Sequence, residues 1–326
     1  MNRRRSSIAF CASALLSMCL AAAPAAAQQY PAKPVRMLVG FSAGSGTDGA
    51  ARMVSQKLTE SLGQPAIVEN RPGSGGMIAT EMVAKAPPDG YTLLMMAAAD
   101  SIQPAIRVKM PYDLTRDFTP ISYVATGIFL LTVHPSVPAK NVKELIAIAR
   151  AKPGGLNYAS SGVGSSAHMA GELFNALANV KTIAVPYKGS PQAAMAVVGG
   201  EVDFAYPTYT SAKPLLDARR LRALAVTTAK RSPFAPEVPT LHEAGVAGYD
   251  RSAWYGVIGP AGLPKDVLGR LEGAITKAVN TPEMKNAFFD QGLVAETTTP
   301  EQFGALIRRE VEQNVKLVRA SGIRRE

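Results

Sequence analysis

The chain has 326 residues, of which 47% are hydrophobic, and a formal net charge of +10. This length and apolar content suffice for a large buried core, and we expect two domains. The basic residues are dispersed, with only short clusters such as residues 219–222, which indicates a solvated surface and argues against a nucleic-acid-binding groove.

The N-terminus predicts export. Within residues 1–27, three arginines at positions 3–5 precede an apolar run, Ile8–Leu20, and a stretch of alanines, in the order of a secretory signal peptide. We expect cleavage after this segment and a periplasmic protein without a membrane span; a twin-arginine signal and a lipoprotein site at Cys19 remain alternatives. Because Cys11 and Cys19 both lie in this segment, the mature chain has no cysteine for a disulfide or a metal site.

Short β-branched runs alternate along the chain with segments of helical periodicity, which predicts an α/β fold. The predicted strands are residues 35–39, 66–69, 92–96, 156–159, 183–185, 202–206 and 221–226. The predicted helices include residues 48–62, 142–151, 166–177 and 191–198, and an apolar stretch, 121–133, precedes the second set of strands. A long terminal helix follows Thr299, its expected N-cap, with Gln302 in the capping-box position.

Two glycine-rich turns each follow a predicted strand and open a predicted helix. Residues 44–49 read Gly-Ser-Gly-Thr-Asp-Gly, and residues 162–167 read Gly-Val-Gly-Ser-Ser-Ala, so both match G-x-G-x-x-G/A. This motif is typical of dinucleotide sites, and Glu69 lies near the position of a ribose-binding carboxylate. The unpaired amides of a helix N-terminus nevertheless bind any small anion, and an exported protein has no exchanging NAD pool. We therefore favour two loops that hold one small anion between two similar domains.

A third glycine-rich turn follows the strand that ends in Glu69. Here we expect Glu69, Asn70 and Arg71 to brace the first loop, with Gly75 and Gly76 admitting the next helix.

The chain offers little for catalysis. Its three histidines, His134, His168 and His242, lack metal-ligand spacing, and neither a G-x-S-x-G elbow nor an H-E-x-x-H motif occurs. Ser160 and Ser161 near His168 would suit hydrolysis, but an anion site uses the same residues. We expect no enzyme, no metal and no cofactor.

Six stretches are characteristic in their order. They read GFSAGSGTDGAAR, VENRPGSGGMIATEMVAKAPPDGYTLL, YASSGVGSSAHMAGE, VPYKGSPQAAMAVVGGEVDFA, LRALAVTTAKRSPFAPEVPTLHEAG and SAWYGVIGPAGLP. With this series the mature chain resembles the periplasmic solute-binding receptors of tripartite tricarboxylate transporters, also called Bug proteins. The resemblance covers essentially the whole mature chain.

The resemblance implies an α/β, two-lobed periplasmic binding protein of type II (Venus flytrap) with two crossing hinge strands. After the signal peptide, residues 1–27, we expect lobe 1 to comprise residues 28–127 and 229–326, and lobe 2 to comprise residues 128–228.

The resemblance also implies that backbone amides and bridging water hold the ligand's carboxylate between the two loops. The residues it implies from the first loop are Phe41, Ser42, Gly46, Thr47 and Asp48, and those from the second are Ser160, Ser161, Gly164, Ser165 and His168. Asp203 and Tyr206 would close the cleft wall with Phe204.

Three assignments have alternatives. Asp48 either stabilises the helix start or orients an ammonium or hydroxyl group of the ligand. His168 either contacts the ligand or is a packed residue. We expect Trp254 and Tyr255 in core or hinge packing rather than at the ligand.

The expected function is capture of a small carboxylate or amino acid, followed by delivery to the permease subunits of a tripartite tricarboxylate transporter. We expect a monomer without nucleic-acid partners. The alternatives are a ligand sensor that signals to a membrane kinase and a dinucleotide-dependent enzyme.

Overall fold

The computed structural model describes residues 30–321, 323 and 325. The chain divides into two units, Met1–Ala32 and Lys33–Glu326, and every element below belongs to the second unit. The predicted signal peptide lies outside the described residues. No helix of the described part is both long and apolar enough to cross a membrane.

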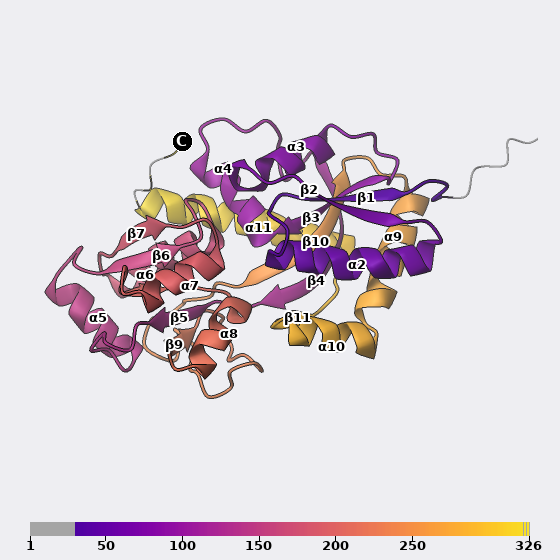
Figure 1. Ribbon diagram of the computed structural model, residues 1–326. Helices are drawn as coiled ribbons and strands as arrows, with labels where there is room; N and C mark the ends of the chain where they lie inside the picture. Colours follow the sequence, from indigo (N-terminus) through magenta and orange to yellow (C-terminus); the bar gives the residue numbers. More distant parts are fainter. Residues whose placement is uncertain (1–29, 322, 324, 326) are drawn as a thin grey trace, which may run out of the picture. The chain divides into compact units, whose positions relative to one another are not determined.

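Strands from both ends of the second unit build the first sheet, in the order β11-β4-β10-β3-β1-β2 (Figure 1). β1 pairs in parallel with β2 and β3, whereas β10 runs antiparallel to β3 and β4, and β11 antiparallel to β4. The strands are β1 (Val35–Val39), β2 (Ala66–Asn70), β3 (Thr92–Ala97), β4 (Phe118–Gly127), β10 (Ala253–Pro260) and β11 (Leu293–Ala295).

The second sheet has the order β7-β6-β8-β5-β9. β6 pairs in parallel with β7 and β8, and β5 runs antiparallel to β8 and β9. Its strands are β5 (Leu130–Val133), β6 (Asn157–Ser160), β7 (Ile183–Pro186), β8 (Phe204–Ala205) and β9 (Arg222–Val226).

Helices follow most of the strands. They are α2 (Gly46–Leu62), α3 (Met77–Ala84), α4 (Gln103–Ile106), α5 (Val142–Ala151), α6 (Ser166–Ala178), α7 (Ser190–Val198), α8 (Tyr209–Asp217), α9 (Lys265–Val279), α10 (Pro282–Asp290) and α11 (Pro300–Ser321), with short 3-10 turns η1 (Ser74–Gly76) and η2 (Ala98–Ile102). α11 packs on β4, η2 and α4 and also contacts α6, so it connects elements of both halves (Figure 1).

The chain crosses between the sheets twice. β4 ends at Gly127 in the first sheet and β5 begins at Leu130 in the second; β9 then ends at Val226, and the chain returns at Ala253, where β10 begins. Each sheet has its own apolar core. The fold is therefore α/β with two lobes, which confirms the predicted fold class.

The start of α11 confirms the capping box. The Thr299 amide donates to Gln302 Oε1 (3.1 Å), and the Gln302 amide donates to Thr299 Oγ1 (3.3 Å). Phe303 and Ile307 of this helix are buried in the core of the first lobe. The predicted strand 202–206 is shorter, Phe204–Ala205, because the bend at residues 201–203 and the loop before α8 take its ends.

Candidate ligand-binding site

The first loop, residues 40–45, joins β1 to α2 and is closed by three local hydrogen bonds. The Ser45 amide donates to Ser42 O (3.1 Å), Ser45 Oγ accepts from the Asp48 amide (3.2 Å), and Asp48 Oδ2 accepts from the Gly44 amide (2.9 Å). Gly44 has φ +79°, a left-handed conformation that costs glycine little. Helix geometry leaves the first amides of α2 without helical acceptors, and those of Gly46 and Thr47 have no partner among the described residues.

Asp48 is 3% exposed and is held from three sides. Besides the Gly44 amide, Oδ2 accepts from Arg52 Nε (3.0 Å), and Oδ1 accepts from Asn70 Nδ2 (2.9 Å). Burial raises the pKa of Asp48, but the hydrogen bonds from Arg52, Gly44 and Asn70 together outweigh it and leave the pKa below its ordinary value. These contacts favour the interpretation in which Asp48 stabilises the helix start.

Two more predicted residues belong to the first loop. Asn70 Nδ2 also donates to Phe41 O (3.0 Å), so Asn70 braces the loop as expected. The Glu69 carboxylate instead accepts from Arg36 Nε (2.7 Å) and Arg71 Nη2 (3.1 Å). The Phe41 ring is half-buried and lies against Gly76, and Ser42 is exposed.

The second loop, residues 161–165, joins β6 to α6 and repeats this construction. The Ser165 amide donates to Gly162 O (3.2 Å), Ser165 Oγ accepts from the His168 amide (3.1 Å), and His168 Nδ1 accepts from the Gly164 amide (3.2 Å). Gly164 has φ +71°. The amides of Ser166 and Ala167 have no partner among the residues that the structure describes.

His168 thus takes the place in the second loop that Asp48 takes in the first. Its ring is 8% exposed, and burial lowers its pKa, against a smaller opposite effect of Glu172. Because Nδ1 accepts a hydrogen bond, the ring is neutral and carries its proton on Nε2. Ser160 is buried beneath this loop and donates to Gly162 O (3.4 Å), whereas Ser161 is half-buried.

A cavity of about 500 Å³ opens at the start of α2. Its lining is Gly44, Ser45, Gly46, Asp48, Gly49, Ala50, Met53, Gly127, Ile128, Pro191, Thr208, Tyr209, Thr210, Ser211, Ala253, Tyr255, Gln291, Gly292 and Leu293. Of the predicted site residues, the structure brings only Gly46 and Asp48 to this lining. The second loop lies instead beside Gln103 and Ile106, which are the nearest side chains to Gly164.

Asp203 and Tyr206 do not line the cavity. The Asp203 carboxylate accepts from the Asn157 amide (2.7 Å). Tyr206 is 1% exposed, and its ring centroid lies 5.9 Å from that of Phe204 in the core of the second lobe. Residues two apart in an extended segment share a face, so Tyr206 points into the core together with Phe204.

Sequence reasoning missed the wall that faces α2. Four hydroxyl groups gather there at the starts of α7 and α8: Thr208 Oγ1 lies 3.3 Å from Ser190 Oγ, 3.2 Å from Thr210 Oγ1 and 3.0 Å from Ser211 Oγ. Three contacts use three of the four hydroxyl protons, which leaves one to donate elsewhere. The run of hydroxyl residues at 208–211, at the start of a helix, was the available signal.

Charge is scarce in this cavity. Among the lining residues Asp48 alone bears a charged side chain, and its carboxylate oxygens already accept hydrogen bonds. No group of three or more His, Cys, Asp or Glu side chains suited to a metal ion occurs in the described part of the chain. The cavity therefore presents mainly uncharged donors.

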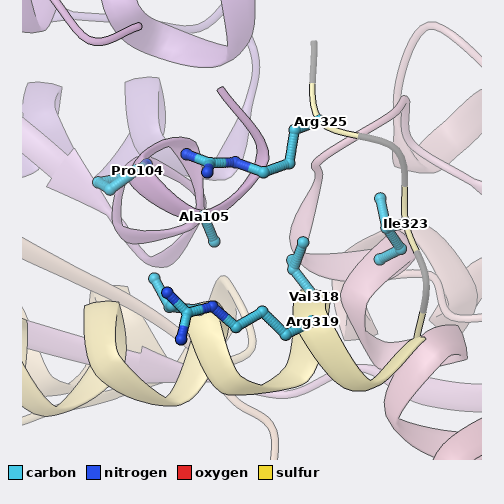
Figure 2. A pocket seen from close by; sticks show the side chains of 7 residues that line it. Pro104, Ala105, Val318, Arg319, Ile323 and Arg325 are labelled. Carbon is cyan, nitrogen blue, oxygen red and sulfur yellow. The ribbon is translucent and has the colours of Figure 1, made fainter. Parts of the chain in front are cut away.

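A second cavity, of about 330 Å³, lies between α4 and the end of α11. Figure 2 shows Arg319 and Arg325 beside it, among the apolar side chains of Pro104, Ala105, Val318 and Ile323. Val315 also lines this cavity. None of the predicted site residues lines it, and no N-terminus of a long helix opens into it. The cavity at α2 is therefore the better candidate site.

Known proteins resemble this chain over nearly its full length. BugT of Bordetella pertussis is 34% identical, with 92% of this chain and 93% of BugT covered. The structure of Rpa4515 of R. palustris with adipate matches with a TM-score of 0.82 at 34% identity, covering 90% of this chain and 98% of that one. The structure of MatC (Rpa3494) of Rhodopseudomonas palustris with bound malate matches with a TM-score of 0.80 at 30% identity, covering 89% and 100%.

The family described as "Tripartite tricarboxylate transporter family receptor" matches residues 50–323. This match includes both sheets except β1, and it includes most of α2 and the whole of the second loop. The chain belongs to the tripartite tricarboxylate transporter receptors, the Bug-type periplasmic solute-binding proteins.

Proposed function

We propose that this protein is an extracytoplasmic receptor that captures a small carboxylate at the start of α2 and delivers it to the permease of a tripartite tricarboxylate transporter. The observation that carries the proposal is the pair of open amides at Gly46 and Thr47, beside a cavity large enough for a small ligand. These amides lie at the positive end of the α2 dipole, where a carboxylate is stabilised.

The second loop does not line the cavity in this structure, and in this proposal it supplies the other half of the site when the lobes close. Ser160, Ser161, Gly164 and Ser165 belong to a loop with the same hydrogen-bond pattern as the first, and its two open amides offer the same chemistry. A ligand that contacts both loops binds the closed state more tightly than the open state, and it thereby shifts the protein toward closure. In this proposal the lobes are residues 28–127 with 229–326, and residues 128–228.

Dicarboxylates are the first ligands to test. Rpa4515 was solved with adipate and MatC with malate, and both are at least 30% identical to this chain. The hydroxyl groups of Thr208, Thr210 and Ser211 give the far end of the cavity polar partners for a second polar group. Amino acids remain the alternative ligand class.

The test uses the full chain, expressed so that the cell processes the proposed signal peptide, residues 1–27. Purified protein is screened by thermal shift against dicarboxylates, tricarboxylates, aromatic acids and amino acids, with NAD and FAD as controls. A ligand at a hundredfold excess over its dissociation constant stabilises by about 2.7 kcal/mol, so micromolar ligands are detectable. A shift from dinucleotides alone would overturn the receptor proposal.

Delivery to a permease is tested in cells. Deletion of the gene should abolish uptake of the carboxylate that the screen identifies, and restoring the gene should restore it. Unchanged uptake combined with lost transcriptional induction would instead support the sensor alternative. Size-exclusion chromatography with light scattering tests the expected monomer.

A further inference from the structure

Tyr255 lies on β10, next to the start of α2. Its neighbour Trp254 packs against Phe303 of α11, with ring centroids 5.8 Å apart. Successive strand residues point to opposite faces, so Tyr255 points away from α11 and toward α2. A Cβ atom on Gly46 would lie 2.4 Å from Tyr255 Oη, which places this hydroxyl group directly beside the first residue of the helix.

The hydroxyl group of Tyr255 has no hydrogen-bond partner among the described residues, although only 6% of the residue is exposed. Both Tyr255 and Gly46 line the cavity at α2. Burial raises the pKa of Tyr255 to about 12, so the group stays protonated at physiological pH and is available as a donor. Because Tyr255 lines the cavity, a ligand bound there can accept this hydrogen bond.

We propose that Tyr255 Oη donates a hydrogen bond to the carboxylate bound at the amides of Gly46 and Thr47. The inference rests on the proposed function and adds a side-chain contact from β10 to that site. Three donors are then available at the start of α2, two from the helix and one from the sheet. Such a half-site accepts an oxyanion and rejects an ammonium group, so at this end it selects a carboxylate.

The glycine at position 46 is part of this arrangement. Any side chain there would collide with the Tyr255 hydroxyl group. Gly46 therefore permits both the close approach of the phenol and access to the amides.

The test compares Tyr255→Phe with the unchanged protein by titration calorimetry, with adipate and malate as probes. The matched control is Tyr112→Phe: Tyr112 is also 6% exposed and does not line the cavity. For the probe that the unchanged protein binds, Y255F should bind roughly 10- to 100-fold more weakly, as expected for a lost hydrogen bond to a charged group. Y112F should bind as the unchanged protein does, and Y255F should keep its melting temperature without ligand.

A second readout does not depend on the stability of a variant. With tyrosine labelled by 13C at Cζ, the Tyr255 resonance, assigned by its loss in Y255F, should move when the probe is added. Y255F affinity within twofold of the unchanged protein, or an unmoved resonance at saturation, would overturn the inference and leave the receptor proposal intact. If the unchanged protein binds neither these probes nor any acid of the screen, the proposed function fails, and this inference fails with it.

Discussion

Replacing Asp48 with asparagine tests whether this carboxylate holds the first loop in shape. Three groups donate to its two oxygens: the Gly44 amide, Arg52 Nε and Asn70 Nδ2. An asparagine has one oxygen and one NH2 group, so either orientation of its amide places a donor against a donor. Asp48→Asn therefore keeps the size of the side chain and breaks at least one partly buried hydrogen bond.

The expected loss follows from these contacts. The ion pair with Arg52 contributes little, because the Arg52 side chain is 55% exposed and screened by solvent. The Gly44 and Asn70 bonds are partly buried, and losing one of them while leaving its donor unpaired lowers the free energy of unfolding by about 1–3 kcal/mol. For a chain of this size, that corresponds to a fall in melting temperature of roughly 2–5 °C. Ligand affinity should fall by about tenfold, because the Gly46 amide is no longer held in place.

The assay is thermal unfolding at pH 7 and pH 3, together with calorimetric titration of the identified carboxylate. Because the folded-state pKa of Asp48 is lowered, its contribution to stability is complete above the ordinary carboxyl pKa and is lost as the pH falls through the folded value. The difference between D48N and the unchanged protein should therefore shrink at pH 3.

Asp117→Asn is the matched control. Asp117 also accepts from a backbone amide four residues earlier, that of Asp113, and from an arginine, Arg116, but it lies outside the cavity lining. D117N should leave ligand affinity unchanged. Wild-type stability and wild-type affinity in D48N would refute the bracing role of Asp48.

Three further predictions concern the second loop and the helix that joins the lobes. Burial lowers the pKa of His168, so between pH 7.5 and 5.5 the unfolded chain binds a proton more readily than the folded chain does. The melting temperature of the unchanged protein should therefore fall more steeply than that of H168N over this pH range. An equal fall in the two proteins would contradict this prediction. Gly164→Ala should lower the free energy of unfolding in urea by about 1–3 kcal/mol, because the residue has φ +71°. The control, Gly269→Ala in α9, has open space around it and should leave this free energy unchanged or raise it. Asn314→Ala should lower the free energy of unfolding by about 3–5 kcal/mol, because Asn314 accepts a hydrogen bond from the buried Arg251 guanidinium (2.7 Å). A loss below about 1 kcal/mol in the same urea assay would disprove this role.

Much of the local structure could be predicted from the sequence because its causes lie within a few residues. The capping box at Thr299 was predicted, and it depends on contacts three residues apart. The N-caps Ser45 and Ser165 depend on contacts of the same span, although they were not predicted. The strand at Val35–Val39 and the helix at Val142–Ala151 have the predicted bounds, because hydrophobic period and capping agree there. The bracing by Asn70 was also expected, and Asn70 is the last residue of the neighbouring parallel strand β2.

The candidate site was only partly predictable. Of the twelve residues proposed for it, Gly46 and Asp48 line the cavity, whereas Tyr206 lies in the core. The sequence shows that Phe204 and Tyr206 alternate with smaller residues, but not which face of the segment meets the core. Tyr255 was assigned to packing because the sequence likewise does not show which face of its strand meets the core.

By itself the sequence determined the α/β class, the two equivalent loops and the chemistry of their helix starts, because local hydrogen bonds and side-chain periodicity carry that information. Only the tertiary structure placed β10 between β3 and β4, and thereby brought Tyr255 beside Gly46, more than 200 residues away. The tertiary structure alone also placed the hydroxyl groups at the start of α8 in the same cavity as the start of α2. Strand order and the facing of distant segments arise from burial of apolar surface over the whole chain, which no local pattern encodes.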